Sequence, residues 1–278
     1  MNILRSSFEL RPDAVLGHST GEIAAAYASG ALSLPAAITI AYYSGHAAQH
    51  LAGEGAMAAV GLGRGDVETY LAGEDGVDVA CENSPQNITL SGDKAALEGV
   101  IAKIKGDHPD RVARLLRVER AFHSQHVKDI GDELENLLHQ GLDSVTGGQG
   151  KAPAVSLFST VTAGKVEGKG KLGAAYWREN LEAPVRFREA ARLLLQSTTS
   201  RDGSILLEVG PHSALSQPLE EILAEEEGAK AQYVATVIRG QSVVKSLLSS
   251  VGHLYQRNAS VNLSHSVAGG KPVEGLLS

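Results

Sequence analysis

A long uncharged stretch constrains this chain most: from Ile23 to Gly53 the sequence contains no Asp, Glu, Lys or Arg. An uncharged segment of this length belongs either in a membrane or in a protein core. Small residues dominate it, and Gly30, Ser33 and Pro35 interrupt it, which favours two buried helices joined at Gly30 over a membrane span. Ser33 is expected to cap the second helix, which continues to about Leu51.

Charge and cysteine content narrow the class of protein. The 278 residues carry 25 Lys and Arg against 32 Asp and Glu, and the net charge of −7 argues against nucleic-acid partners and against an anionic membrane surface. Hydrophobic residues make up 43%, enough for a sizeable core. The single cysteine, Cys81, excludes a disulfide framework and a multi-cysteine metal site. The first residues lack a secretory signal, so a reducing, cytoplasmic setting is expected.

Alternating strand and helix patterns predict an α/β fold with an inserted small subdomain. Between residues 56 and 119 the order is strand, helix, strand, strand, helix, strand, which is typical of a ferredoxin-like unit. We therefore expect a large α/β subdomain from residues 1–55 and 120–257, with the ferredoxin-like subdomain at 56–119. Residues 258–278 have little pattern and are expected to form a linker or tail.

The motif Gly17-His18-Ser19-Thr20-Gly21 matches G-x-S-x-G, follows the apolar run Ala14-Val15-Leu16 and precedes a helix. In that context the pattern predicts a sharp turn that presents the serine hydroxyl, as in a hydrolase-like fold. The helix N-terminus would supply N–H groups to a developing oxyanion, and the N–H of Thr20 is the expected donor. The alternative interpretation is a glycine-flanked turn in which Ser19 is a helix cap.

A nucleophilic serine needs a base, and three histidines are candidates. His123 follows a predicted strand of the insert and precedes a helix, where the chain returns to the large subdomain. His18 is adjacent to Ser19 in sequence, and His212 follows another predicted strand. An alternative interpretation places a metal on His123, His126 and Asp129, which share one side of a helix.

The nucleophile segment, residues 17–27, resembles that of polyketide synthase acyltransferase domains, which are related to malonyl-CoA:acyl-carrier-protein transacylases. The likeness to fungal reducing polyketide synthases is strongest, and it covers residues 5–255. Further motifs match in the same order: Gly55-Ala56-Met57-Ala58-Ala59-Val60, Asn83-Ser84-Pro85, Ser91-Gly92, Ala121-Phe122-His123-Ser124, Tyr176-Trp177, Asn180-Leu181, Pro184-Val185-Arg186-Phe187 and Glu208-Val209-Gly210-Pro211-His212-Ser213-Ala214-Leu215.

The resemblance implies a mechanism and its partners. Ser19, deprotonated by His123, would take an acyl group from acyl-CoA and pass it to the phosphopantetheine thiol of an acyl carrier protein. It implies substrate-binding roles for Thr20, His18, Phe122 and His212, no bound cofactor, and a place within a larger multidomain synthase. Phe122 resembles the bulky residue found in family members that use malonyl rather than methylmalonyl units.

Two departures from the family pattern bear on substrate and activity. The run Tyr42-Tyr43-Ser44-Gly45 has a serine where the family usually has an arginine that would pair with the malonate carboxylate. Losing such a partner costs about 2–5 kcal/mol, so Ser44 weakens the inference of malonyl specificity, the family default, and makes a neutral acyl starter unit an alternative. The family also has an earlier Gly-x-Gly-x-Gln-like turn that supplies a second oxyanion donor, and the chain is expected to be N-terminally truncated before that turn.

Three interpretations of function therefore stand. The first is an acyltransferase for malonyl or for a neutral starter unit. The second is a catalytically impaired remnant or a fragment that docks carrier proteins. The third is a serine hydrolase, which the absence of an Asp or Glu and then a His at hydrolase spacing after Ser19 disfavours.

Overall fold

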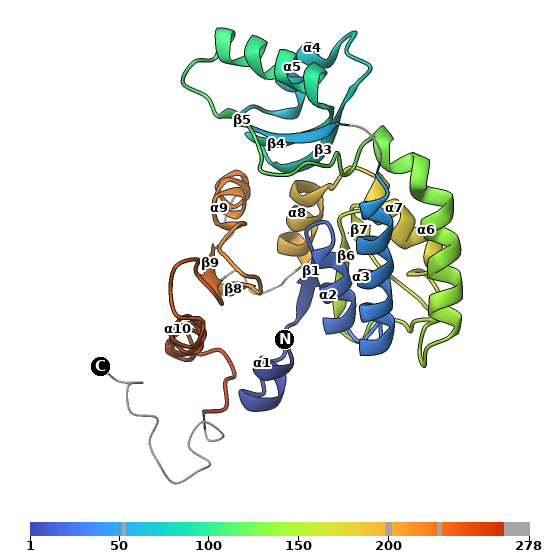
Figure 1. Ribbon diagram of the computed structural model, residues 1–278. Coiled ribbons are helices and arrows are strands. Elements are labelled where there is room, and N and C mark those ends of the chain that lie inside the picture. The colour runs from blue at the N-terminus through green and yellow to red at the C-terminus, as the bar shows by residue number, and fades with distance from the viewer. Residues whose placement is uncertain (52–53, 198–201, 227–229, 264–278) are drawn as a thin grey trace. The chain divides into compact units, whose positions relative to one another are not determined.

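The computed structural model describes residues 1–51, 54–197, 202–226 and 230–263 and divides into two compact units (Figure 1). The central unit comprises Ala14–Gln196, and the terminal unit comprises Met1–Asp13 together with Ser197–Ser278. The candidate nucleophile and its candidate base both belong to the central unit.

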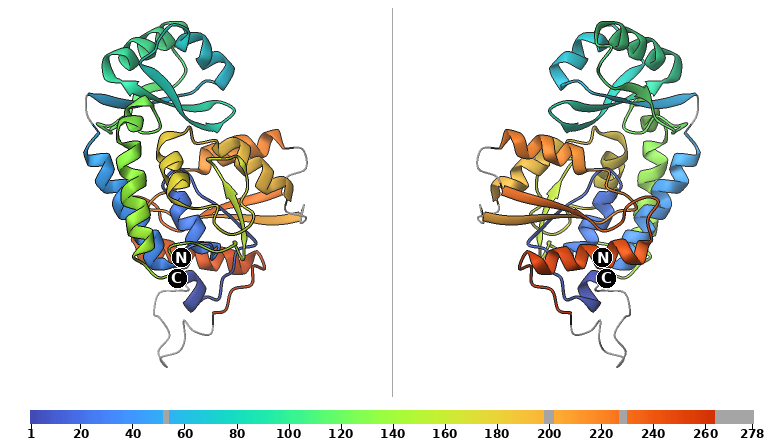
Figure 2. Two further views of the ribbon diagram at one scale, coloured as in Figure 1. Left: turned by 90° about the vertical axis from the view of Figure 1, so that its right-hand side faces the viewer. Right: turned by 90° about the vertical axis from the view of Figure 1, so that its left-hand side faces the viewer.

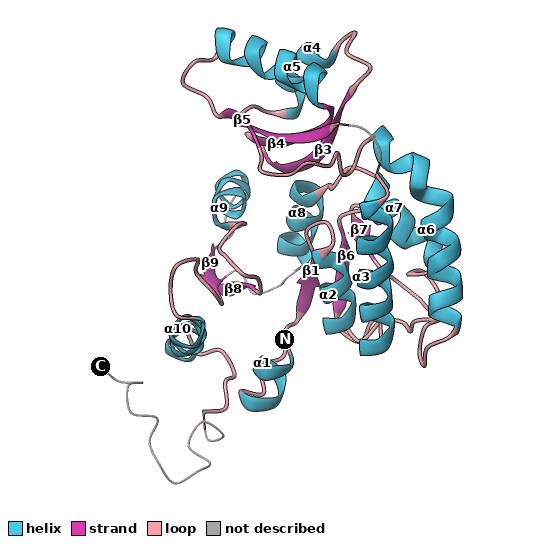
Figure 3. Ribbon diagram, viewed as in Figure 1, coloured by secondary structure: helices cyan, strands magenta, loops and turns pink. Residues whose placement is uncertain are grey.

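The central unit contains helices and strands in alternation (Figure 3). Its helices are α2 (Gly21–Ala28), α3 (Leu34–Gln49), α4 (Arg64–Leu71), α5 (Lys94–Asp107), α6 (Gln125–Asp143), α7 (Ala174–Glu182) and α8 (Phe187–Ser197). Its strands are β1 (Ala14–Leu16), β2 (Gly55–Val60), β3 (Val77–Ser84), β4 (Asn87–Asp93), β5 (Ala113–Leu115), β6 (Ser156–Ser159) and β7 (Gly164–Lys165).

A small three-stranded sheet ends at the nucleophile motif. Strand β1 pairs with β6 in parallel, β6 pairs with β7 antiparallel, and the order is β1-β6-β7. Leu157 of β6 is fully buried in a core that also holds Ile40 of α3, Leu138 of α6 and Trp177 of α7. The apolar run Ala14-Val15-Leu16 before the motif forms β1. The helix α7 was not predicted from the sequence.

The uncharged stretch forms the two expected helices. The Oγ of Ser33 accepts a hydrogen bond from the N–H of Ala36 at 3.2 Å, so Ser33 caps α3 as predicted. Inward-facing residues such as Ala26 and Ile40 are fully buried in the core beneath them. Helices α3 and α6 lie side by side in both views of Figure 2. Among the residues that the structure describes, no helix has the length and apolarity needed to cross a membrane.

The second sheet has four strands in the order β3-β4-β2-β5, with α4 and α5 against one face (Figure 1). The element order β2, α4, β3, β4, α5, β5 is the one that the sequence predicted for the ferredoxin-like insert. Ile88, Leu90, Leu97 and Ile104 fill the core between sheet and helices. Asp93 occupies the N-cap position of α5, but its side chain makes no capping hydrogen bond, and its Oδ1 lies 2.7 Å from Nε2 of His126.

The segment after α7 joins the edge of this sheet. The N–H of Val185 donates to the carbonyl of Ala80 at 2.8 Å, and the N–H of Glu82 donates back to the carbonyl of Val185 at 2.9 Å. Cys81 and Val185 form a parallel bridge, and burial raises the pKa of the Cys81 thiol to about 12. The four-stranded sheet is therefore joined by backbone hydrogen bonds to the segment that follows α7.

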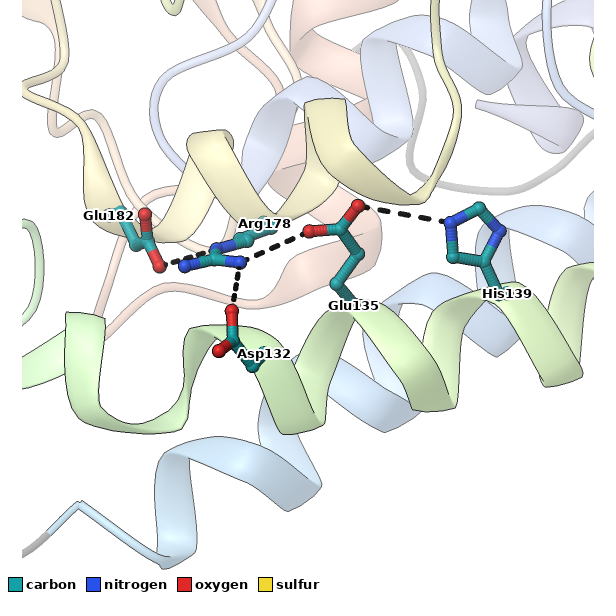
Figure 4. A network of polar contacts seen from close by, with 5 residues as sticks. All are labelled: Asp132, Glu135, His139, Arg178 and Glu182. Carbon is teal, nitrogen blue, oxygen red and sulfur yellow. Dashed lines mark hydrogen bonds and ion pairs between the residues drawn. The ribbon is translucent and has the colours of Figure 1, made fainter.

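An ion-pair network fastens α7 to α6 (Figure 4). The guanidinium of Arg178 binds Glu182 at 2.8 Å, Glu135 at 3.2 Å and also Asp132. These carboxylates raise the pKa of Arg178 further above its usual value, with the hydrogen bond to Glu182 contributing most. A Cβ atom at Gly131 of α6 would come within 2.0 Å of Glu182 Oε1, so a larger residue there would require the ends of the Glu182 and Arg178 side chains to move.

The terminal unit contains α1 (Asn2–Ser7), α9 (Ser216–Glu225) and α10 (Val243–Gln256) with a two-stranded parallel sheet. Its strands are β8 (Asp202–Glu208) and β9 (Lys230–Ala235). A small core brings Leu4 and Phe8 against Val251 of α10. Val261 and Leu263 pack on the same cluster, so the first part of the expected linker or tail belongs to this core. Residues 264–278 of that expected tail lie outside the described residues.

Candidate active site

The nucleophile motif forms a tight strand-to-helix turn. Ser19 has a φ of +53°, a left-handed conformation that is uncommon for residues other than glycine. A Cβ atom at Gly17 would lie 2.2 Å from the Cα of Glu22, so the turn closes only with glycine there. Backbone hydrogen bonds from Gly21 to His18 and from Glu22 to Ser19 fix its shape. The structure thus presents Ser19 at the start of α2, as the motif predicted.

The Ser19 hydroxyl meets the predicted histidine. Its Oγ lies 2.7 Å from Nε2 of His123, although the two residues are 104 positions apart in sequence. On the other side of the ring, Nδ1 lies 2.9 Å from the carbonyl oxygen of Ala183. A carbonyl only accepts, so Nδ1 carries the proton and Nε2 is the acceptor for the serine hydroxyl. This tautomer is the one that general-base catalysis at Ser19 requires.

His123 is held in an unusual position. It has a φ of +57°, the side chain is buried, and its backbone N–H donates to the carbonyl of Leu181 at 3.2 Å. Burial lowers the pKa of His123 to about 4; the bond to Ala183 opposes this effect, and His18 adds to it. The imidazole is therefore neutral, and able to accept a proton, at physiological pH.

The end of α7 positions both residues. Besides the two carbonyls that hold His123, the side-chain amide of Asn180 donates to the carbonyl oxygen of Ser19 at 3.3 Å. Asn180 and Leu181 belong to a family motif, but the sequence alone assigns no role to either residue. The amide of Asn180 is buried, and a buried Asn within a helix is a signal that can be recognised only when burial is known.

The buried carboxylate of Glu22 holds the nucleophile turn in place. Glu22 is fully buried and accepts hydrogen bonds from the N–H of Thr160 at 3.0 Å and from its hydroxyl at 2.6 Å. The hydroxyl of Tyr176 binds the other carboxylate oxygen. Burial raises the pKa of Glu22, opposed by these hydrogen bonds, and the pKa of Tyr176 is raised by burial and by Glu22. The sequence offered one signal for this role: Glu22 is the charged residue immediately before the uncharged stretch.

The remaining predicted site residues fall into two groups. Thr20, Phe122 and Ser44 line one groove of about 520 Å³ beside the Ser19–His123 pair. The Nε2 of His18 donates to Oδ1 of Asn83 at 2.7 Å, which links the nucleophile turn to β3, and its ring lies 5.4 Å from that of Phe187. His212 belongs to the terminal unit, where its Nδ1 accepts from the N–H of Arg239 at 3.3 Å, and its substrate-binding role stays a prediction.

The alternative metal site is not assembled. His126 pairs with Asp93 at 2.7 Å, while Nε2 of His123 faces Ser19. Within the described ranges no three His, Cys, Asp or Glu side chains are grouped so as to hold a metal ion.

Comparisons with known proteins all point to the same protein family. The model of the acyl transferase domain family matches residues 1–259. The chain is 46% identical over 277 residues to the highly reducing polyketide synthase FUM1 of Gibberella moniliformis, covering 99% of this chain and 10% of that protein. The chain thus spans about a tenth of the length of its curated relatives.

Solved structures agree with these relatives. The acyltransferase domain from the second module of the salinomycin polyketide synthase matches with a TM-score of 0.80 at 29% identity, covering 96% of this chain and 59% of that one. A loading acyltransferase from the avermectin modular polyketide synthase matches with a TM-score of 0.79 at 30% identity, covering 91% and 75%. The predicted fold class, a hydrolase-like large subdomain with a ferredoxin-like small one, is confirmed. The subdomain boundaries proposed above stay predictions.

Proposed function

Because the chain belongs to the acyl transferase domain family, in its polyketide synthase branch, we propose that it carries acyl groups from coenzyme A to an acyl carrier protein through an ester on Ser19. The observation that carries this proposal is the 2.7 Å contact between Ser19 Oγ and His123 Nε2, with Nδ1 held by Ala183. The two residues act as a dyad in which the Ala183 carbonyl fixes the tautomer.

In the first half-reaction the Oγ of Ser19 attacks the thioester carbonyl carbon of acyl-CoA. Its proton passes to Nε2 of His123, and a carbon–oxygen bond forms as the carbonyl becomes an oxyanion. When the carbon–sulfur bond breaks, the imidazolium returns the proton to the departing coenzyme A thiolate. The low pKa of His123 makes the imidazolium a strong acid for this second transfer.

The oxyanion is stabilised at the start of α2. The turn's hydrogen bonds use the N–H groups of Gly21, Glu22 and Ile23, which leaves the N–H of Thr20 unused among the residues that the structure describes. This N–H is the proposed donor, and the partial positive charge of the helix N-terminus adds to its effect.

In the second half-reaction the phosphopantetheine thiol of an acyl carrier protein takes the place of coenzyme A. His123 removes the thiol proton, the sulfur attacks the ester carbon, and the carbon–oxygen bond breaks as the proton returns to Ser19. The acyl group is thus moved without net oxidation or reduction. The chain itself needs no bound cofactor, acts as part of a larger multidomain synthase, and works in the cytoplasm.

The decisive experiment is the intact mass of the chain after incubation with acyl-CoA donors. An acyl adduct is expected on the wild type and is expected to be absent from Ser19→Ala. His123→Gln, which keeps a side chain of similar length, should slow adduct formation at least about a thousandfold. Adding a carrier protein bearing phosphopantetheine should then move the acyl mass from this chain to the carrier.

Two other outcomes would contradict the proposal. Release of free acid at the same rate with and without carrier protein would identify a hydrolase. A folded chain that forms no adduct with any donor would identify a catalytically impaired remnant or a carrier-docking fragment.

A further inference from the structure

The loop that carries His123 runs from the four-stranded sheet to α6. His123 lies two residues before the first residue of α6, and its left-handed backbone is a conformation that the surrounding structure must enforce. On one side the end of α7 does this: the carbonyl of Leu181 accepts from its N–H, and the carbonyl of Ala183 accepts from its ring. The position of the imidazole depends further on what holds the start of α6.

Asp78 of β3 binds the first residue of α6. The backbone N–H of Gln125 donates to Oδ2 of Asp78 at 2.9 Å. The first N–H groups of a helix have no acceptor within the helix, and the first turn of α6 has no acidic residue of its own. Asp78 therefore supplies, from a strand of the small subdomain, a carboxylate that satisfies this N–H and that the positive end of the helix dipole favours.

Asp93, at the end of β4, binds the second residue of α6. Its Oδ1 lies 2.7 Å from Nε2 of His126, and this nitrogen is the donor because a carboxylate only accepts. The side chain of Asp93 is 55% exposed but that of His126 only 13%, so solvent screens this contact less than one between two exposed groups. The backbone N–H of Asp93 donates to the carbonyl of Gly76 at 2.8 Å, so the strand end that carries the carboxylate is itself fixed.

The same sheet also contacts the loop before His123. A Cβ atom at Gly55 would lie 2.7 Å from the backbone nitrogen of Ala121, so the start of β2 packs directly against this part of the loop. Ser124 joins the two ends of the loop: its hydroxyl donates to the carbonyl of Ala121 at 2.7 Å and accepts from the N–H of His126 at 3.3 Å. His123 thus lies between two points at which the chain is held to one sheet.

Small movements of this loop matter because the reaction depends on one short contact. Nε2 of His123 lies 2.7 Å from Oγ of Ser19, and a displacement of about 1 Å in such a contact can cost about a hundredfold in rate. Asp78 and Asp93 are the carboxylates that hold the first turn of α6. Loss of either one therefore lets the loop move relative to Ser19.

From these contacts we propose that Asp78 and Asp93 are positioning residues for the acylation of Ser19. By holding the first turn of α6 they keep the imidazole of His123 where it accepts the proton of the serine hydroxyl. This inference rests on the proposed function, because it assigns the two aspartates to the formation of the Ser19 ester. It gives the ferredoxin-like subdomain a part in the chemistry, since both carboxylates come from its sheet.

The test compares rates of adduct formation at saturating donor, with the faster of malonyl-CoA and acetyl-CoA. Asp93→Ala should lower the saturating rate at least about tenfold, whereas the donor concentration for half-saturation should stay unchanged because Asp93 acts through His123. Asp93→Asn keeps an oxygen that accepts from His126 and should react within about threefold of the wild type. Asp78→Ala and Asp78→Asn should repeat this pattern through the N–H of Gln125.

Asp129→Ala is the matched control. Asp129 is an exposed carboxylate in the second turn of α6, and within the described ranges it has no hydrogen-bond or ion-pair partner. Its loss should leave both the saturating rate and the half-saturating concentration unchanged. Circular dichroism of each variant shows that it is folded before the rates are compared.

A double variant separates positioning from a general loss of structure. In His123→Gln the base is absent, so adding Asp93→Ala to that variant should change the residual rate less than about twofold. A substitution that only loosened the fold would lower the rate in both backgrounds. The residual rate is followed over hours by intact mass.

The outcomes separate this inference from the proposed function. Asp78→Ala and Asp93→Ala variants that acylate at the wild-type rate would overturn the positioning role and leave the acyltransferase intact. An equal loss of rate with and without His123, or a loss confined to the half-saturating concentration, would overturn it as well. A wild-type chain that forms no adduct with either donor would overturn both.

Discussion

Ser19 and His123 share a backbone conformation that is uncommon for residues with a Cβ atom: both have a positive φ, +53° for Ser19 and +57° for His123. Left-handed backbone in residues with a Cβ costs about 1 kcal/mol or more and persists only where surrounding structure enforces it. Here the enforcement is visible in the glycine-limited turn below Ser19 and in the carbonyls of Leu181 and Ala183 around His123. The strain coincides with the two groups that must meet.

The first prediction at this scale concerns the pH dependence of acylation. Burial lowers the pKa of His123 to about 4, so the base stays neutral far below the usual histidine value of 6.5. The rate of adduct formation on Ser19 should therefore be constant from pH 8 to about pH 5.5 and fall only as the pH approaches 4. Rapid-quench mass measurements across this range check it; a rate that halves near pH 6.5 would contradict it.

The same shift affects stability. Unfolded chains protonate His123 near pH 6.5, whereas the folded protein keeps it neutral down to about pH 4. The free energy of unfolding therefore keeps its full value above pH 6.5. It decreases by up to about 3 kcal/mol as the pH falls from 6.5 towards 4. Urea unfolding of the wild type and of His123→Gln measures this, because other titrating groups act equally in both. Parallel pH curves for the two proteins would show that burial of His123 has no such cost.

A third prediction concerns Glu22. In Glu22→Ala the N–H of Thr160 loses its acceptor, whereas the hydroxyl of Thr160 still reaches the carbonyl of Gly17 at 3.2 Å and that of Tyr176 still reaches Ser159 Oγ at 2.7 Å. One stranded buried donor costs about 1–3 kcal/mol, so we expect about 2–3 kcal/mol of destabilisation in urea unfolding. Tyr176→Phe removes only one donor and is the matched control, expected to cost about 1 kcal/mol. Equal losses in the two variants would mean that Glu22 does not organise the cluster.

At the scale of elements, α7 connects the site to α6, although the sequence patterns did not predict this helix. Arg178, in the middle of α7, binds Glu135 of α6, and the last turn of α7 with the residue after it supplies Asn180, Leu181 and Ala183 to the site. Because a single helix contacts both Ser19 and His123, movement of α7 changes the two together. Gly131 of α6 leaves room for the side-chain ends of Glu182 and Arg178 in this network.

A fourth prediction tests that packing with two glycines. Gly131→Ala places a methyl group against the side-chain ends of Glu182 and Arg178, so their ion pair must shift and the variant should gain no stability from the better helix former. Gly99→Ala lies in the interior of α5, where a Cβ meets nothing within 4 Å, and should stabilise the protein by about 0.5–1 kcal/mol. Thermal and urea unfolding of both variants give the comparison. A Gly131→Ala protein stabilised as much as Gly99→Ala would show that the Arg178–Glu182 pair moves without cost.

At the scale of the whole molecule, one segment, residues 183–185, contacts both the four-stranded sheet and the site. Residues 183–185 first hold His123 and then pair with β3, and His18 reaches the same sheet through Asn83. The ferredoxin-like part therefore contributes to the site without supplying the nucleophile or the base. Its hydrogen bonds fix the chain that orients the imidazole.

The fifth prediction follows from this connection. Val185→Pro removes the N–H that donates to Ala80, while Val185→Ala keeps it and serves as the control. The proline variant should show faster amide exchange in β3 and at least about tenfold slower acylation of Ser19, since Ala183 loses its support. Hydrogen exchange and adduct kinetics on both variants measure this. If amide exchange in β3 becomes faster but the acylation rate of Ser19 is unchanged in the proline variant, pairing with β3 does not position His123.

The sequence by itself determined the local features of this protein. Four features depend mainly on residues close together in the chain and could therefore be predicted from the sequence. They are the strand-turn-helix at Ser19, the cap at Ser33, the burial of the uncharged stretch and the element order of the insert. His123 was identified from its place at an element boundary, and its family motif supported that choice.

Only the tertiary structure decided which distant groups meet. The roles of Ala183, Asn180, Glu22 and Thr160 depend on contacts between residues far apart in the chain, which no period or spacing encodes. Asp93 shows the same limit: it stands at the N-cap of α5, but its carboxylate pairs with His126, 33 residues away, and not with the first turn of the helix. Local sequence specifies conformation, whereas packing in three dimensions selects the partners of buried polar groups, because each of them must be satisfied wherever the fold carries it.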